Sequence, residues 1–142
     1  SDLAMALVLE YRQVLRDQTS DFMAYGGPAL PQLEGLFRFT EVQCQKGRCI
    51  CPVGAFAVDY GEVPDDVRAA IDAFLSDSVK WLTRVLETGR EQGEFQFIGE
   101  ANVKAVSILA GLQGARQMAR IHQQDVLHLV MDQIRAELGL TA

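Results

Sequence analysis

Apolar residues recur at helical spacing in nearly every segment of this chain. Runs in which apolar and polar residues alternate, which are typical of half-buried strands, are almost absent. The clearest segment covers residues 64–93, where a proline occupies the first helical position, two aspartates lie in the first turn and a glycine ends the run. Its apolar residues form one face about eight turns long. The sequence therefore predicts an all-α fold built around one long helix.

Further helices are predicted on both sides of this segment. The same spacing indicates helices over residues 3–17, 33–46, 52–61, 99–122 and 125–138, with Asp125 as the N-cap of the last one. With 142 residues, of which 49% are hydrophobic, the chain has the size and apolar content of one folded domain. We therefore expect a single antiparallel helical bundle over residues 1–142.

Charge and hydropathy limit the possible partners. The net charge is −6 and the basic residues are scattered, so we expect this chain alone not to bind nucleic acid. No apolar run is long enough to span a membrane, and the first residues carry acids where a signal peptide would carry bases. These features predict a cytoplasmic protein without a membrane partner. No carboxylate pair is matched to a nucleophile or a metal, so we expect neither catalysis nor a cofactor.

The last predicted helix carries more apolar residues than one buried stripe requires. A terminal helix with two apolar stripes must lie in the centre of the fold or contact another chain. We expect the last two helices to pair with their copies about a twofold axis, giving a homodimer with an intersubunit four-helix bundle. The expected interface residues are Gly111, Gly114, Ala115, Leu127, Val130, Met131, Ile134 and Leu138.

Three cysteines lie close together in "CQKGRCICPVG", residues 44–54. Zinc is disfavoured because three thiols without a nearby histidine do not complete a tetrahedral site. Cys44, Cys49 and Cys51 could still form a thiol switch or hold a soft ion such as Cu(I), with Lys46 and Arg48 lowering a thiol pKa. The other interpretation is that they are buried side chains, since cysteine buries readily and Cys44 continues an apolar helix face.

Three segments, in order, resemble the C-terminal regulatory domain of TetR-family transcriptional regulators. They are "CPVGAFAVDYGEVPDDVRAAIDAF" at residues 51–74, "LETGREQGEF" at residues 86–95 and "ILAGLQGARQMAR" at residues 108–120. The resemblance implies a ligand-responsive repressor that releases operator DNA when a small molecule enters a cavity in each subunit. Operator DNA would be read by an N-terminal helix-turn-helix domain, and we interpret this chain as a regulatory fragment from which that domain is missing.

The family architecture also suggests which residues surround the ligand. Large side chains spread over four helices and polar residues on otherwise apolar stripes give a candidate set: Phe37, Thr40, Phe56, Phe74, Ser78, Trp81, Gln113 and Met118. We expect Gln113 and Ser78 to orient a hydrophobic ligand. No basic residue is expected on these faces, which disfavours a strongly anionic effector. Two other functions stay open, a cysteine-based redox or soft-metal sensor on the same scaffold and a free-standing helical dimerisation module.

Overall fold

A computed structural model of the protein describes residues 2–24, 28–46, 51–121 and 125–140, and these residues form helices and connecting segments without a strand. The predicted all-α fold is therefore confirmed. The elements are α1 (Asp2–Ala24), α2 (Ala29–Gln45), α3 (Pro52–Ala57), the short 3-10 helix η1 (Tyr60–Glu62), α4 (Asp65–Glu91), α5 (Ala101–Ala119) and α6 (Val126–Glu137).

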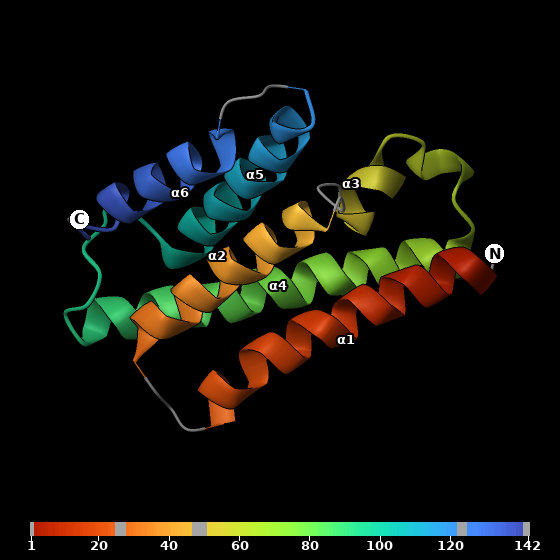
Figure 1. Cartoon of the computed structure of the whole chain (residues 1–142). Coiled ribbons are helices and arrows are strands. Elements are labelled where there is room, and N and C mark those ends of the chain that lie inside the picture. Colours follow the sequence, from red (N-terminus) through yellow and green to blue (C-terminus); the bar gives the residue numbers. More distant parts are fainter. Residues whose placement is uncertain (1, 25–27, 47–50, 122–124, 141–142) are drawn as a thin grey trace.

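The long helix α4 lies in the middle of the bundle (Figure 1). It packs against α1, α2, α3 and α5, and α6 packs on the outer side of α5. In the figure α1 and α4 run from right to left, α2 and α5 run back, and α6 returns to the left. Neighbours along the chain are thus mostly antiparallel, as short connections between packed helices require.

Buried apolar side chains form two clusters. The larger one joins α2, α4, α5 and α6 and includes Phe95 from the α4–α5 connection. The smaller one holds Val8 of α1 with Val67 and Ile71 of α4, and α3 packs against it through Val53 and Phe56. The first turns of α4 therefore anchor α1 and α3, while its later turns belong to the larger cluster.

Four helices differ in extent from the sequence prediction. The helix expected from residue 33 begins at Ala29, and the one expected over residues 52–61 ends at Ala57 and is followed by η1. The helix expected over residues 3–17 continues to Ala24, because the segment before the pair Gly26–Gly27 contains no residue that ends a helix. The helix expected over residues 99–122 covers only Ala101–Ala119, and Gly99 before it has a φ of +93°. That left-handed conformation cannot belong to an α-helix. The predicted N-cap of α6 is confirmed, since the Asp125 side chain accepts from the backbone N–H of His128 at 3.2 Å.

The end of α4 is a tight turn built on two glycines. Gly93 has a φ of +77°, and the carbonyl of Gly89 accepts from the N–H groups of Glu94 at 2.8 Å and Phe95 at 3.0 Å. Phe95 thereby folds back onto α4 and is buried. A Cβ at position 89 would lie 2.2 Å from Cδ2 of the Phe95 ring, so this contact requires glycine.

The same turn caps a helix that lies far away in sequence. The Glu94 carboxylate accepts from the N–H of Ala29 at 2.9 Å and from that of Leu30 at 3.2 Å. These are the first two residues of α2, whose N-cap position is Pro28 and has no side-chain cap of its own. A negative charge at a helix N-terminus is stabilising because it satisfies free N–H groups and complements the helix dipole.

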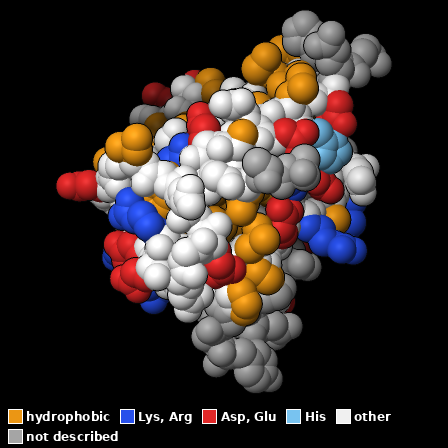
Figure 2. Space-filling view, turned by 90° about the vertical axis from the view of Figure 1, so that its left-hand side faces the viewer, with side chains coloured by type: hydrophobic (Ala, Val, Ile, Leu, Met, Phe, Trp, Pro, Cys, Tyr) orange, Lys and Arg blue, Asp and Glu red, His pale blue; other side chains and the backbone are white. Residues whose placement is uncertain are grey.

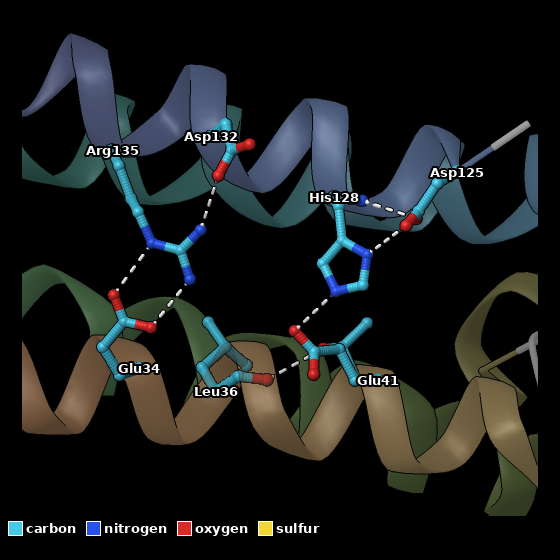
Figure 3. A network of polar contacts seen from close by, with 8 residues as sticks. Glu34, Leu36, Glu41, Asp125, His128, Asp132 and Arg135 are labelled. Atoms are coloured by element: carbon cyan, nitrogen blue, oxygen red, sulfur yellow. Dashed lines mark hydrogen bonds and ion pairs between the residues drawn. The ribbon is translucent and has the colours of Figure 1, made fainter. Parts of the chain in front are cut away.

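Two groups of ion pairs connect α6 with α2 (Figure 3). Arg135 makes a bidentate pair with Glu34, with N···O distances of 2.9 and 2.8 Å, and also contacts Asp132 at 2.9 Å. About two turns away along α6, the His128 ring lies between Asp125 and Glu41, with its Nε2 at 3.1 Å from a Glu41 oxygen. These contacts fix α6 over α2 along most of its length.

Figure 2 views the molecule from the end at which α4 and α6 finish. On that face the acidic and basic side chains are interspersed, and the hydrophobic side chains lie in separate small areas between them. The described side chains there do not gather into one basic area of the kind that binds a phosphate backbone. None of the described helices combines the length and the apolar content needed to cross a lipid bilayer.

Replacing Gly89 by alanine should destabilise the protein by about 1–3 kcal/mol, because the new methyl group must displace the Phe95 ring or bend the end of α4. Gly61→Ala is the matched control, since a Cβ there meets nothing within 4 Å, and it should change stability by less than about 0.5 kcal/mol. Urea unfolding followed by circular dichroism measures both. A Gly89→Ala variant as stable as the original chain would contradict the contact.

The contacts of His128 with Asp125 and Glu41 should make the free energy of unfolding depend on pH. Hydrogen bonding to Asp125 raises the pKa of His128 above its ordinary value of 6.5, with Glu41 adding to the effect, and the same bond lowers the pKa of Asp125 below 3.8. The protonated ring is thus favoured in the folded state. Its contribution is fully present below the unfolded pKa of 6.5 and is lost as pH rises through the higher folded pKa.

We therefore expect the difference in unfolding free energy between the original chain and His128→Gln to be larger at about pH 5.5 than at about pH 8.5. Asp125 stays ionised at both values because its pKa is lowered. Denaturant titrations at the two pH values give the difference. A difference that is constant or grows with pH would show that the charged imidazole does not stabilise the α2–α6 contact.

Candidate ligand-binding cavity

An apolar cavity of about 360 Å³ lies between the two hydrophobic clusters, where α1 to α5 approach one another. Its volume is within the range of small-molecule sites, at the lower end. A larger hollow of about 810 Å³ lies at the α4–α5 turn, but its wall includes the charged side chains of Arg90, Lys104 and Glu137 and the fully exposed Ile98. We regard that hollow as a surface depression and the apolar cavity as the candidate site.

The structure brings five of the eight sequence-predicted ligand residues to the wall of this cavity, namely Thr40, Phe74, Ser78, Trp81 and Gln113. They come from α2, α4 and α5. The two hydroxyl groups donate within their own helices, Thr40 to the carbonyl of Leu36 at 2.9 Å and Ser78 to that of Phe74 at 2.8 Å. Their side-chain oxygens can therefore act mainly as acceptors toward an occupant.

The other three predicted residues lie elsewhere. Phe37 is buried in the larger cluster, where the Arg135 guanidinium stands 4.8 Å from the centre of its ring. Phe56 packs against the smaller cluster, and Met118 is half exposed near the end of α5. Helical spacing predicted that each of these residues lies on an apolar side of its helix. It could not predict whether that side borders the cavity or packs against a neighbouring helix.

Two residues that the sequence did not single out belong to the wall, Tyr11 of α1 and Arg116 of α5. Arg116 is 5% exposed and donates to the Tyr11 hydroxyl oxygen at 2.6 Å. This corrects the expectation that no basic residue faces the cavity. The signal was available, because Arg116 follows Leu112 by four residues and so lies on the same buried helix face.

Tyr11 is held in place by aromatic contacts as well. Its ring packs edge-on against Phe39 at 5.3 Å and against Phe74 at 5.7 Å between centroids. Burial raises the pKa of Tyr11 far above its ordinary value, and nearby Cys51 raises it further. The phenol is therefore neutral at physiological pH, and its oxygen can accept from Arg116.

Two buried donors in the cavity wall have no partner among the residues that the structure describes. They are Nε1 of Trp81 and Nε2 of Gln113. Gly54 of α3 makes room for the Gln113 amide, since a Cβ at position 54 would lie 1.8 Å from Nε2. Buried N–H groups are costly to leave without an acceptor, and a bound ligand can supply one.

The cysteines occupy different surroundings. Cys51 is 6% exposed and lines the cavity, whereas Cys44 is partly buried against the larger cluster. Cys51 is a free thiol, and Cys49 lies outside the described residues. Within the described ranges, no three His, Cys, Asp or Glu side chains come together in a group that could hold a metal ion.

Most of the residues expected at a dimer interface pack inside the subunit instead. Ala115, Leu127, Met131, Ile134 and Leu138 are buried in the larger cluster. The reason is the position of α6, which packs on α5 and is tied to α2, so that its main apolar stripe points into the core. Gly111 faces Val130 of α6, where an added Cβ would lie 3.7 Å from Cγ1, and Gly114 is open.

The surplus apolar surface lies on other residues of the same two helices. Val103 and Val106 of α5 and Leu129 of α6 are more than half exposed, and Val106 also lines the apolar cavity. With Gly114 they define what we call the outer α5–α6 face. Sequence spacing indicated that such a surplus exists, but it did not distinguish the inner stripe from the outer one.

Comparison with known proteins gives two matches. A family model described as "Tetracyclin repressor-like, C-terminal domain" matches residues 32–134. The crystal structure of a TetR-family transcriptional regulator from Agrobacterium tumefaciens superposes with a TM-score of 0.80 at 25% sequence identity, covering 99% of this chain and 74% of that one. A search of curated protein sequences returned no match.

Proposed function

This chain belongs to the family of tetracyclin repressor-like C-terminal domains of transcriptional regulators, and from that membership we propose that it binds a small effector in the apolar cavity and dimerises. The observation that carries the proposal is the cavity itself. It is bordered by α1 to α5, mostly apolar, and provided with a few polar groups, which is the composition expected of a small-molecule site.

The effector would act through α1. Tyr11 places this helix in the cavity wall, in hydrogen-bond contact with Arg116 of α5. A ligand that contacts this pair can favour one position of α1 over another only through a difference in affinity for the two positions. In the regulator we propose, α1 leads to a helix-turn-helix domain outside these 142 residues, and ligand binding releases operator DNA by changing the distance between two such domains.

We further propose that residues 1–142 act as one regulatory domain and form a homodimer through the outer α5–α6 face. Three exposed apolar side chains and the open Gly114 support this choice of surface, because small residues allow two helices to approach closely. The resulting four-helix bundle would contain α5 and α6 from each subunit. Such a regulator would work in the cytoplasm, without enzymatic activity.

The thiol-sensor alternative has less support. A redox sensor needs a thiolate that an oxidant can reach, and Cys51 and Cys44 are buried and partly buried. Cys51 contributes to the cavity wall instead. We therefore favour a small-molecule effector as the signal.

Occupation of the cavity should be visible in the fluorescence of Trp81, the only tryptophan of the chain and part of the cavity wall. We expect at least one member of a panel of apolar alcohols, amides and acids with six to ten carbons to change this emission and to raise Tm. Ser78→Phe fills the cavity and should weaken binding at least about tenfold.

Ser76→Phe is the matched control, because it makes the same change on the same helix at a residue outside the cavity wall. It should leave the affinity within about twofold. Circular dichroism verifies that both variants fold. If no member of the panel affects Trp81 emission or Tm in the original chain, the cavity is not an effector site.

Dimerisation through the outer α5–α6 face should be sensitive to charge at Leu129. In a twofold interface Leu129→Glu places two carboxylates close together, so the dimer dissociation constant should rise at least about tenfold. Ile98→Glu alters a fully exposed residue at the α4–α5 turn and should have no effect. Sedimentation equilibrium measures both, and a monomer at every concentration up to about 100 μM would overturn the proposed dimer.

A further inference from the structure

Two side chains of the cavity wall carry hydrogen-bond donors that the described part of the chain does not use. They are the indole Nε1 of Trp81 on α4 and the amide Nε2 of Gln113 on α5, and both atoms are buried. An indole N–H can only donate, so it needs an acceptor. A buried donor without an acceptor costs free energy, and an acceptor brought into the cavity would recover that cost.

The other polar side chains of the wall are already engaged within the chain. Thr40 and Ser78 donate to carbonyl oxygens of their own helices. Arg116 donates to the Tyr11 hydroxyl oxygen and has a further interaction within the chain, so its charge does not wait for a ligand. In the described part of the wall, the buried side-chain N–H groups that lack an acceptor are therefore those of Trp81 and Gln113.

The two donors differ in how they can meet an occupant. The Trp81 side chain is 8% exposed and belongs to the larger hydrophobic cluster, so its ring is held by packing. The Gln113 amide lies in the space left by Gly54, at the end of a side chain whose last torsion has a broad energy minimum. This amide can turn toward an occupant, whereas the occupant must place its acceptor to suit Trp81.

We infer that the effector is a neutral, mainly apolar carbonyl compound, such as a ketone or an ester, whose oxygen accepts from Trp81 and Gln113. This inference rests on the proposed function of the cavity as an effector site. A carbonyl oxygen has two lone pairs and no proton, so it satisfies N–H groups without adding a donor that needs its own partner. A carboxylate or an ammonium group would lose its hydration in an apolar cavity without gaining a free counter-ion, because Arg116 is engaged.

A pair of ligands with almost the same shape isolates the carbonyl oxygen. Acetophenone carries C=O where α-methylstyrene carries C=CH₂, and isothermal titration calorimetry measures both without a tryptophan signal. Benzoate and benzylamine have a similar size but are charged at neutral pH. We expect acetophenone to bind at least about tenfold more tightly than either charged compound, because only the neutral ligand enters without losing the hydration of an ion.

Two substitutions assign the carbonyl contact to the proposed donors. Gln113→Leu should lower acetophenone affinity at least about threefold and leave that of α-methylstyrene within about twofold, since only the ketone loses a hydrogen bond. Trp81→Phe also removes volume, so the measure is the ratio of the two affinities, which should fall at least about threefold. Gln117→Leu makes the same change one turn later on α5, at an exposed residue outside the cavity wall, and should alter neither affinity.

Circular dichroism verifies that the variants fold. If Trp81→Phe does not, the infrared carbonyl band of bound acetophenone replaces it, because loss of a hydrogen bond in Gln113→Leu should move that band to higher frequency. Equal losses for ketone and alkene in the folded variants, or an unchanged band, would overturn the carbonyl contact and leave the cavity as an effector site.

The remaining outcomes separate the ligand class from the proposed function. Benzoate or benzylamine binding as tightly as acetophenone would overturn the neutral class, and so would binding of other apolar ligands without binding of acetophenone. Failure of acetophenone, α-methylstyrene and the whole panel of apolar ligands would overturn both the carbonyl assignment and the effector site.

Discussion

The burial of α4 on several sides is the constraint on which the other elements depend. The apolar surface of this 27-residue helix must be buried by its neighbours. The helices α1, α2, α3 and α5 each cover part of that surface. The covering is tight near the ends, where Val67 and Ile71 meet α1 and α3, and where Leu86 is buried in the larger cluster and Gly89 contacts the Phe95 ring. Around Phe74 and Trp81 the surrounding helices do not close completely, and the cavity lies there.

The chemistry of that cavity follows from a few polar groups in an apolar wall. The protein as a whole is acidic, with a net charge of −6, yet the charged side chain that faces this interior space is an arginine. Selectivity for an occupant therefore depends on short-range contacts inside the cavity rather than on the overall charge of the protein. Tyr11 has two roles there, since it orients Arg116 and connects the site with the helix nearest the start of the chain.

Sequence periodicity was enough to predict the helices and their apolar faces, because each helix of a bundle must bury one stripe. It predicted the N-cap at Asp125 and the glycine exit from α4, since both are local in sequence. It could not predict which side of a stripe borders a cavity, and so Phe37 was grouped with Thr40 although the two point to different neighbours. Periodicity also could not predict which side of α6 faces the core. That orientation involves ion pairs such as Arg135–Glu34, whose partners are about a hundred positions apart in the sequence.

The Glu94 carboxylate at the start of α2 has a consequence for the order in which the chain acquires structure. Ala29 and Glu94 are separated by 65 residues, so during synthesis at about 5–20 residues per second the first turn of α2 waits roughly 3–13 s for its cap. Until then its leading N–H groups can be satisfied only by water. The N-terminus of α2 therefore has no cap while the ribosome is still adding α4. Stable packing of the N-terminal half depends on synthesis of the turn after α4, which contains Glu94.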